Sequence, residues 1–283
     1  MYLMSLELSE QEKILINYYY DPIENWMETK KINVPSSFKL YKQIITFLSE
    51  KLKIGSIKNT EDLLKLVDRS YLELNKDFGI NKLTELLYDI PPKILKSYYS
   101  ICEEILDLFS DHLIQRQPTI RVHFQDHNTY QFYPFWHSDP ILGHPPYEKN
   151  IWIPLTKPNT KTMHGFTLSN PKISSKIFKK YCESSPYESK NKDEVIHNNI
   201  FMKQSKLIDC NQGEGVIFDS RIFHSAVPHK TNPRISLDIR IIDKKYLSFP
   251  YPIFRGLGRK KIKFDANNFF ISKEELMILN NHD

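Results

Sequence analysis

The sequence predicts an α+β fold in which a helical N-terminal region packs on an antiparallel β-sandwich or jelly roll. Apolar residues recur at helical spacing through the first 116 residues. From Pro118 onward, short segments alternate between apolar and polar residues, as half-buried strands do. Pro, Gly and Asn turns separate these segments, which is typical of all-β sandwiches and barrels.

Four helical segments are expected in the first 116 residues. Ser9 and Glu12 fit a capping box before the first segment. Two more segments begin near Ser37 and Thr60, and the longest covers residues 94–113. Their apolar stripes at i, i+3 and i+4 indicate helices that pack one face against a larger body.

Six strands are expected in a core that covers residues 117–243: they are residues 119–125, 150–155, 164–168, 205–209, 215–219 and 234–242. The last strand shows the longest and cleanest alternation. Residues 169–204 are polar and partly helical, which indicates an insertion between strands. Residues 244–283 form a C-terminal extension, with a short helix expected at residues 272–279.

Composition and charge argue against a nucleic-acid-binding, secreted or membrane-spanning protein. The net charge of +5 comes from scattered Lys and Arg with no long basic block, so nucleic-acid binding is not expected. Three distant cysteines, Cys102, Cys182 and Cys210, form neither a disulfide framework nor a zinc site and favour a reducing compartment. The N-terminus lacks the apolar core of a secretory signal, and no apolar stretch is long enough to span a bilayer. We therefore expect a cytoplasmic protein away from membranes, of unspecified oligomeric state.

His137-Ser138-Asp139 and the later His224 carry the main chemical signal. Two imidazoles and one carboxylate can form the 2-His-1-carboxylate triad, which holds non-haem Fe(II) and leaves its opposite face open. The triplet alone is weak, because 10 His and 34 acidic residues in 283 supply roughly one such match by chance. Its position between two expected strands strengthens it, whereas the alternative is a set of satisfied polar side chains near a sheet edge.

Arg234 begins the longest expected strand ten residues after His224. Its planar guanidinium suits two-point recognition of a carboxylate, although a strand Arg paired to a surface acid is the alternative. Ser236 lies on the same face of this strand. We expect the segments around residues 224 and 234 to pair as an antiparallel hairpin, which would make His224 and Arg234 neighbours.

These motifs together resemble the Fe(II)/2-oxoglutarate dioxygenase superfamily, and within it the phytanoyl-CoA-hydroxylase-like and streptomycin-biosynthesis-like branch. The resemblance rests on Trp136-His137-Ser138-Asp139, on Phe-Asp-Ser-Arg-Ile-Phe-His at residues 218–224, on Arg234-Ile235-Ser236, and on Gly143-His144-Pro145 and residues 151–156. It covers residues 118–243 and implies a double-stranded β-helix core of the cupin-like, jelly-roll type.

The resemblance also implies specific roles for the residues that match it. His137, Asp139 and His224 would be the iron ligands and the catalytic centre. Arg234 would bind the distal carboxylate of the co-substrate 2-oxoglutarate, and Ser236 would hydrogen-bond it. The implied activity is a hydroxylase that consumes O2, releases succinate and CO2, and acts on a small polar metabolite such as a sugar, an aminocyclitol or a natural-product intermediate.

The type of oxidation stays open at this stage. The presence of Asp139 argues against a halogenase, in which that carboxylate is missing. Desaturation, epimerisation and ring formation share the first steps of hydroxylation and are therefore not separated by the motif.

Further residues are predicted to line the cavity. Asn150 and Trp152 share one face of the second strand and are expected to contact the oxo acid, although Trp152 fits plain core packing as well. Arg121 on the first strand is a similar candidate, with a solvent-facing position as the alternative. His144 and the aromatic Tyr133 are predicted substrate contacts.

The sequence is also compatible with two other classes of protein. The same fold suits a cupin-like metal- or sugar-binding module without oxygenase activity, although such a module needs no oxo-acid anchor like Arg234 with Ser236. A structural protein of a biosynthetic cluster would not depend on His137 for metal binding or for phenotype.

Overall fold

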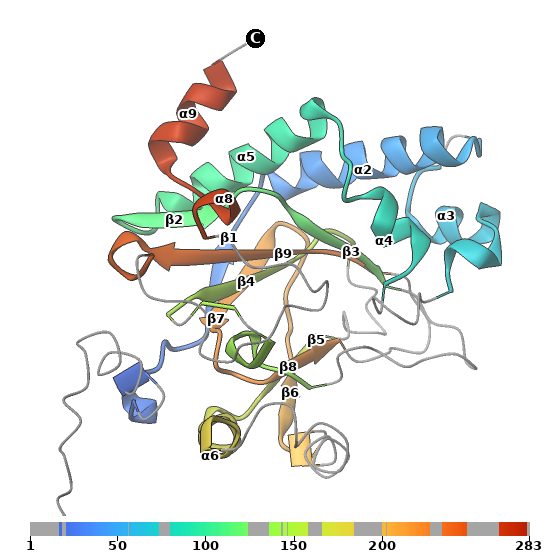
Figure 1. The fold of residues 1–283 in the computed structure, drawn as a ribbon. Helices are drawn as coiled ribbons and strands as arrows, with labels where there is room; N and C mark the ends of the chain where they lie inside the picture. Colours follow the sequence, from blue (N-terminus) through green and yellow to red (C-terminus); the bar gives the residue numbers. More distant parts are fainter. Residues whose placement is uncertain are drawn as a thin grey trace, which may run out of the picture.

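The computed structural model describes residues 17–18, 21–55, 57–73, 80–123, 136–142, 144–145, 147–157, 166–183, 200–201, 203–226, 234–247 and 266–281. Figure 1 shows three layers: helices over one face of a large sheet, and a smaller sheet beneath its other face. The predicted mixture of helices and antiparallel strands is therefore confirmed. Among the described residues, no helix is both long and apolar enough to cross a bilayer.

The large sheet contains seven strands in the order β1-β7-β4-β9-β2-β10, with β3 also paired to β9. Their bounds are β1 Lys30–Asn33, β2 His112–Gln115, β3 Thr119–His123, β4 Lys149–Pro154, β7 Glu214–Asp219, β9 Arg234–Asp243 and β10 Phe270–Ile271. The small sheet has the order β6-β5-β8, with β5 Phe166–Ser169, β6 Ser205–Leu207 and β8 His224–Ala226. All of these pairings are antiparallel.

The helices lie mainly on the outer face of the large sheet (Figure 1). The longer ones are α2 Ser37–Leu52, α5 Pro92–Leu106, α6 Pro171–Glu183 and α9 Lys273–Asn281, and the short ones are α3 Thr60–Leu66, α4 Lys82–Leu86 and α8 Ala266–Phe269. Single 3-10 turns occur at η1 Ile23–Asn25, η2 Arg69–Tyr71, η3 Asp139–Leu142 and η4 Lys244–Tyr246. The side chain of Asn81 caps α4 and also donates to the Val122 carbonyl at 2.7 Å, which fixes α4 to β3.

Strand β9 shows how the sheet divides apolar from polar residues. Its odd-numbered residues Ile235, Leu237, Ile239 and Ile241 belong to the same buried cluster as the apolar residues of α2 and α5. Its even-numbered residues, Arg234, Ser236, Asp238 and Arg240, point to the opposite face, because side chains alternate along a strand. The polar face of β9 therefore points toward the small sheet, where the chemical groups gather.

Replacing Ile239 with Ala tests the apolar layer under the helices. Ile239 is 1% exposed and lies directly opposite Ile151 of β4. We expect the free energy of unfolding to fall by about 2–5 kcal/mol, because the change removes buried methyl groups and leaves a cavity. Chemical denaturation measures this loss, and Ile278→Ala, at a site 56% exposed on α9, serves as the control with a change within about 0.5 kcal/mol. Equal losses in the two variants would contradict the proposed core.

Most expected elements appear close to their predicted positions. Helices begin at Ser37 and Thr60, the C-terminal helix is present as α9, and the polar segment 169–204 contains α6. Each of the six expected strands corresponds to an observed one, with ends shifted by a few residues. The proposed capping box at Ser9 and Glu12 lies outside the described residues.

The structure differs from the local predictions in two places. The helix expected over residues 94–113 ends at Leu106, and the chain turns at Asp111, which has φ of 52°, into β2. Residues 112–115 lie in a strand because β9 and β10 offer hydrogen-bonding partners that the local pattern does not reveal. Strand β1 was not expected in the helical region, since its sequence Lys-Lys-Ile-Asn does not alternate cleanly.

The expected hairpin between the segments around residues 224 and 234 is also absent from the described strands. Strand β8 pairs with β5 in the small sheet, whereas β9 pairs with β2, β3 and β4 in the large sheet. The chain thus passes from one sheet to the other between His224 and Arg234. Turn residues alone do not distinguish a hairpin from such a crossing.

Candidate metal centre

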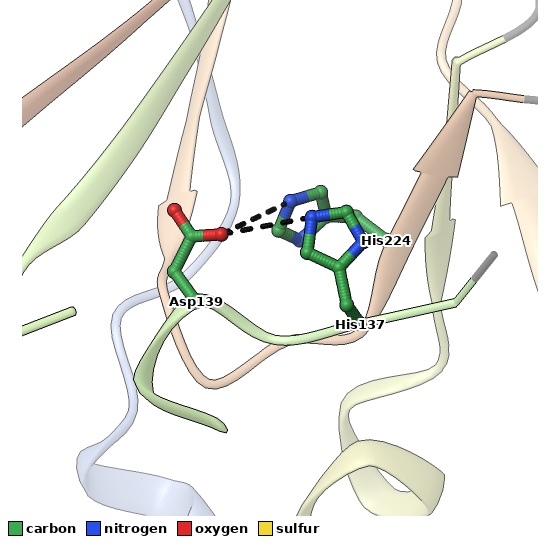
Figure 2. Close-up of side chains that lie close together, drawn as sticks. All are labelled: His137, Asp139 and His224. Atoms are coloured by element: carbon green, nitrogen blue, oxygen red, sulfur yellow. Dashed lines mark ion pairs between the residues drawn. The ribbon is translucent and has the colours of Figure 1, made fainter. Parts of the chain in front are cut away.

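His137, Asp139 and His224 come together at the start of β8, between the two sheets (Figure 2). His137 and His224 form an antiparallel bridge in which each backbone N–H donates to the other residue's carbonyl, at 3.2 and 2.9 Å. The centres of their imidazole rings are 4.3 Å apart. Asp139 follows two residues later at the start of η3, where its backbone N–H donates to the Ser220 carbonyl at 3.2 Å.

Both imidazoles approach the same carboxylate oxygen. His137 Nε2 lies 3.7 Å and His224 Nε2 lies 3.6 Å from Asp139 Oδ1, the contacts that Figure 2 marks. Nitrogen and oxygen ligands bound about 2.1 Å from one ion lie about 3.0–3.4 Å from each other. The observed separations are about 0.2–0.7 Å longer than these, so a small closure of the three side chains would bring them to coordination distance.

The hydrogen bonds made by Asp139 and His224 are compatible with a bound metal ion. Asp139 Oδ2 accepts a hydrogen bond from Arg240 Nε at 2.8 Å, while the buried Oδ1 accepts none from the residues that the structure describes. His224 Nδ1 lies 3.0 Å from the Ile222 carbonyl, so this nitrogen carries the proton and donates to that carbonyl. The Nε2 lone pair of His224 then points toward Asp139 Oδ1. A buried oxygen left without a partner costs about 1–3 kcal/mol, a cost that a bound cation would remove.

The charge states of the site also suit a metal. Burial alone would raise the pKa of Asp139, but Arg240 foremost, and then the neighbouring histidines, hold that pKa well below its usual value. Burial lowers the pKa of His224 despite the nearby Asp139 carboxylate. At neutral pH the site therefore combines an ionised carboxylate with a neutral imidazole, the forms that bind metals.

The turn before His224 is held by a buried ion pair. Arg221 donates through Nε and Nη2 to the two carboxylate oxygens of Asp219, each at 2.8 Å. Its guanidinium also lies between the rings of Tyr18 and Trp26, at 4.4 and 4.5 Å from their centres. Such two-point pairing with aromatic stacking fixes the end of β7 and hence the start of β8, where His224 lies.

Arg234 and Ser236 lie on the same face of β9 as Arg240. Arg234 is buried, its guanidinium carbon is 5.6 Å from the centre of the Trp152 ring, and it lies opposite His123 of β3. Ser236 is buried as well. The structure therefore places both predicted oxo-acid contacts on the sheet face that points toward the small sheet, although in a different sheet from His224.

The remaining predicted residues have varied surroundings. Asn150 is buried opposite Arg240, and Trp152 packs in the apolar cluster between the sheets. Arg121 donates through Nε to Asp238 Oδ2 at 2.6 Å, so its guanidinium is held by a carboxylate. His144 Nδ1 lies 3.2 Å from Glu148 Oε2. Tyr133 lies outside the described residues.

Sequence reasoning missed Arg240 and Glu148, which both lie beside Asp139. Arg240 Nε is 3.8 Å from Glu148 Oε2, and the side chain of Glu148 is fully buried. Burial raises the pKa of Glu148, while His144 and Arg240 oppose that change. The alternation of side chains along the two strands could have identified both residues. Arg240 is at an even position of the same strand as Arg234 and Ser236, and Glu148 is two residues before Asn150 and four before Trp152.

Comparisons with known proteins give only weak similarities. No protein-family model and no curated protein matches this chain. Similar solved structures include the non-heme alpha ketoglutarate dependent carbocyclase SnoK from nogalamycin biosynthesis, which is 12% identical over 93% of this chain and 96% of its own, with a TM-score of 0.46. AviO1 from Streptomyces viridochromogenes Tue57 is 11% identical over 81% of this chain and 96% of its own, with a TM-score of 0.42.

A third similar structure is the epimerase SnoN in complex with Fe3+, alpha ketoglutarate and nogalamycin RO. It is 10% identical over 82% of this chain and 83% of its own, with a TM-score of 0.39. Similarities at this level are too weak to assign a fold family, a ligand or an activity. Those assignments depend instead on the strand pairing and the side-chain geometry of this chain.

Proposed function

We propose that this protein is a non-haem Fe(II)/2-oxoglutarate-dependent oxygenase with a double-stranded β-helix core. The observation that carries the proposal is the convergence of two His Nε2 atoms on one buried carboxylate oxygen that accepts no hydrogen bond within the described part of the chain. Two His and one carboxylate are the ligand set of Fe(II) oxygenases, which need open coordination positions for other ligands. Two antiparallel sheets facing each other around this site support the jelly-roll core.

In this proposal His137, Asp139 and His224 hold the iron. When bound, Fe(II) supplies the activation of O2 and the oxidation of substrate, coupled to conversion of 2-oxoglutarate to succinate and CO2. The hydrogen bond from His224 Nδ1 to Ile222 orients that imidazole, and the backbone bridge between His137 and His224 fixes the spacing of the two rings.

Arg234, with Ser236, is the proposed anchor for the distal carboxylate of 2-oxoglutarate. Both side chains are buried and lie on the face of β9 that points toward the small sheet. On the same sheet face, Arg121 contacts the carboxylate of Asp238 at 2.6 Å and Arg240 contacts that of Asp139 at 2.8 Å, so guanidinium–carboxylate pairs occur on the face that carries Ser236. Asn150 and Trp152 complete the proposed wall beside them, and His144 is the proposed substrate contact.

The substrate we propose is a small polar metabolite, such as a sugar, an aminocyclitol or a natural-product intermediate, and the proposed reaction is hydroxylation. This choice follows the sequence resemblance to the streptomycin-biosynthesis-like branch. The widely spaced cysteines favour a cytoplasmic location, and both described ones, Cys102 and Cys210, are buried and unpaired by disulfides. We also propose that the chain is divided into a helical N-terminal region of residues 1–116, a catalytic core of residues 117–243 and a C-terminal extension of residues 244–283.

Addition of Fe(II) and then 2-oxoglutarate to the metal-free protein under anaerobic conditions tests the proposal. We expect one Fe(II) to bind and the oxo acid to produce a visible absorbance band, because it binds to the iron directly. Admission of air should then yield succinate even without substrate, which is measured by chromatography. Iron binding without the band or succinate would favour a cupin-like binding module, and absence of iron binding would reject both readings.

A further inference from the structure

Among the described residues, Arg240 makes the shortest side-chain contact with Asp139, shorter than that of either histidine. It lies in β9 opposite Asn150 of β4, and the next residue, Ile241, pairs with Ile114 of β2 on the other side of the strand. Its side chain is 11% exposed, and Nε lies 2.8 Å from Asp139 Oδ2. Its Nη1 donates to Gln115 Oε1 at 3.3 Å, which holds the guanidinium from a second strand.

A second group of ligand-type side chains surrounds the same guanidinium. Asp139, His144 and Glu148 could hold a metal by spacing alone. However, Arg240 Nε lies 2.8 Å from the Asp139 carboxylate and 3.8 Å from that of Glu148. A fixed positive charge in this place disfavours a second cation. Arg240 therefore acts as the counter-ion of the two carboxylates.

Arg240 contacts only one of the two carboxylate oxygens of Asp139. Oδ2 accepts a hydrogen bond from the guanidinium, whereas Oδ1 accepts none from any described residue and lies 3.6–3.7 Å from the two histidine Nε2 atoms. A guanidinium is a planar donor with a fixed direction, so it restrains rotation of the carboxylate more strongly than an ammonium does.

We propose that Arg240 is a positioning residue that makes Asp139 a one-oxygen metal ligand. The inference rests on the proposed function and deepens it. By holding Oδ2 away from the histidines, Arg240 leaves only Oδ1 for the metal. A carboxylate that used both oxygens would take up one of the coordination positions that the oxo acid and O2 require. Side chains that orient metal ligands in this way commonly change metal affinity by about 10–100-fold.

Titration of the metal-free protein with Co2+, followed by visible absorption, tests this role in Arg240→Gln and Arg240→Lys. We expect Arg240→Gln to bind Co2+ roughly 10–100-fold more weakly than the unmodified protein, with a changed absorption spectrum. Arg240→Lys retains the charge and should recover part of the affinity but not the spectrum. Arg116→Lys is the control, because it alters an Arg–carboxylate pair, with Glu275, at the surface.

The outcomes separate this inference from the proposed function. Failure of the unmodified protein to bind Co2+ would reject the metal centre and, with it, the role of Arg240. Binding by the unmodified protein with the same affinity and spectrum in both Arg240 variants would reject only the positioning role. Thermal melting of the metal-free proteins shows which variants are folded, and if Arg240→Gln is unfolded, the spectrum of Arg240→Lys decides. Equal changes in Arg116→Lys would also overturn the inference.

Discussion

Replacing Asp139 with Asn is expected to abolish Fe(II) binding at micromolar metal and to eliminate succinate formation. The substitution keeps the shape of the side chain but removes the charge that both histidines and Arg240 face. Loss of one partner from a buried charge pair costs about 3–5 kcal/mol, which corresponds to roughly 10²–10³-fold or more in affinity. Isothermal titration with Fe(II) under anaerobic conditions measures the change.

Asp243→Asn is the control for this experiment. Asp243 is the last residue of β9 and contacts the exposed Lys245 at 3.1 Å, away from the histidines. Its replacement should leave Fe(II) affinity unchanged. The Asp139 variant should also be less stable without metal, because Arg240 loses its carboxylate partner. Undiminished Fe(II) binding by Asp139→Asn would mean that the metal, if any, binds elsewhere.

The parts of this site that could be predicted from sequence were those with a local pattern. The alternation of β9 separated its apolar residues from Arg234 and Ser236, and the same alternation contained Arg240. The triplet His137-Ser138-Asp139 placed two ligand-type side chains next to each other in space because they are next to each other in sequence. Local spacing therefore predicted which of these side chains share one face of a strand or lie in one turn.

Long-range pairing was the part that sequence could not supply. The polar strand β1 exists because β7 offers it a free edge, and β2 is a strand rather than the end of α5 because β9 and β10 pair with it. Neither partner is visible from the local pattern. The expected hairpin between His224 and Arg234 failed for the same reason, since the two residues lie in strands of different sheets.

The placement of His224 and Arg234 in different sheets changes the expected effect of 2-oxoglutarate binding. In a hairpin, the metal ligand and the oxo-acid anchor would move together with one turn. In the structure His224 belongs to the small sheet and Arg234 to the large sheet, so the proposed co-substrate would contact residues from both. Binding of the oxo acid should then restrain the two sheets relative to each other. Substitution of Arg234 should weaken the binding of 2-oxoglutarate while leaving the three metal ligands in place.

Replacing Arg234 with Met is therefore expected to weaken 2-oxoglutarate binding by roughly 10²–10⁴-fold, while Fe(II) affinity stays close to that of the unmodified protein. Two charge-assisted hydrogen bonds of about 1.5–3 kcal/mol each would be lost, and each 1.4 kcal/mol corresponds to about tenfold in affinity. The absorbance band of the anaerobic Fe(II) protein, titrated with the oxo acid, measures this change. Arg234→Lys should be intermediate, because it keeps the charge but loses the planar fork.

Arg116→Met provides the comparison for Arg234, since Arg116 pairs with Glu275 at 3.3 Å on the surface and should leave both affinities unchanged. The combination of weak oxo-acid binding with normal Fe(II) binding separates an anchor from a residue that only supports the fold, because a damaged fold would weaken both ligands. If Arg234→Met bound 2-oxoglutarate normally, the anchor would have to be another cation. Arg121 would then be the next to test, because it lies directly opposite Ser236 on the same face.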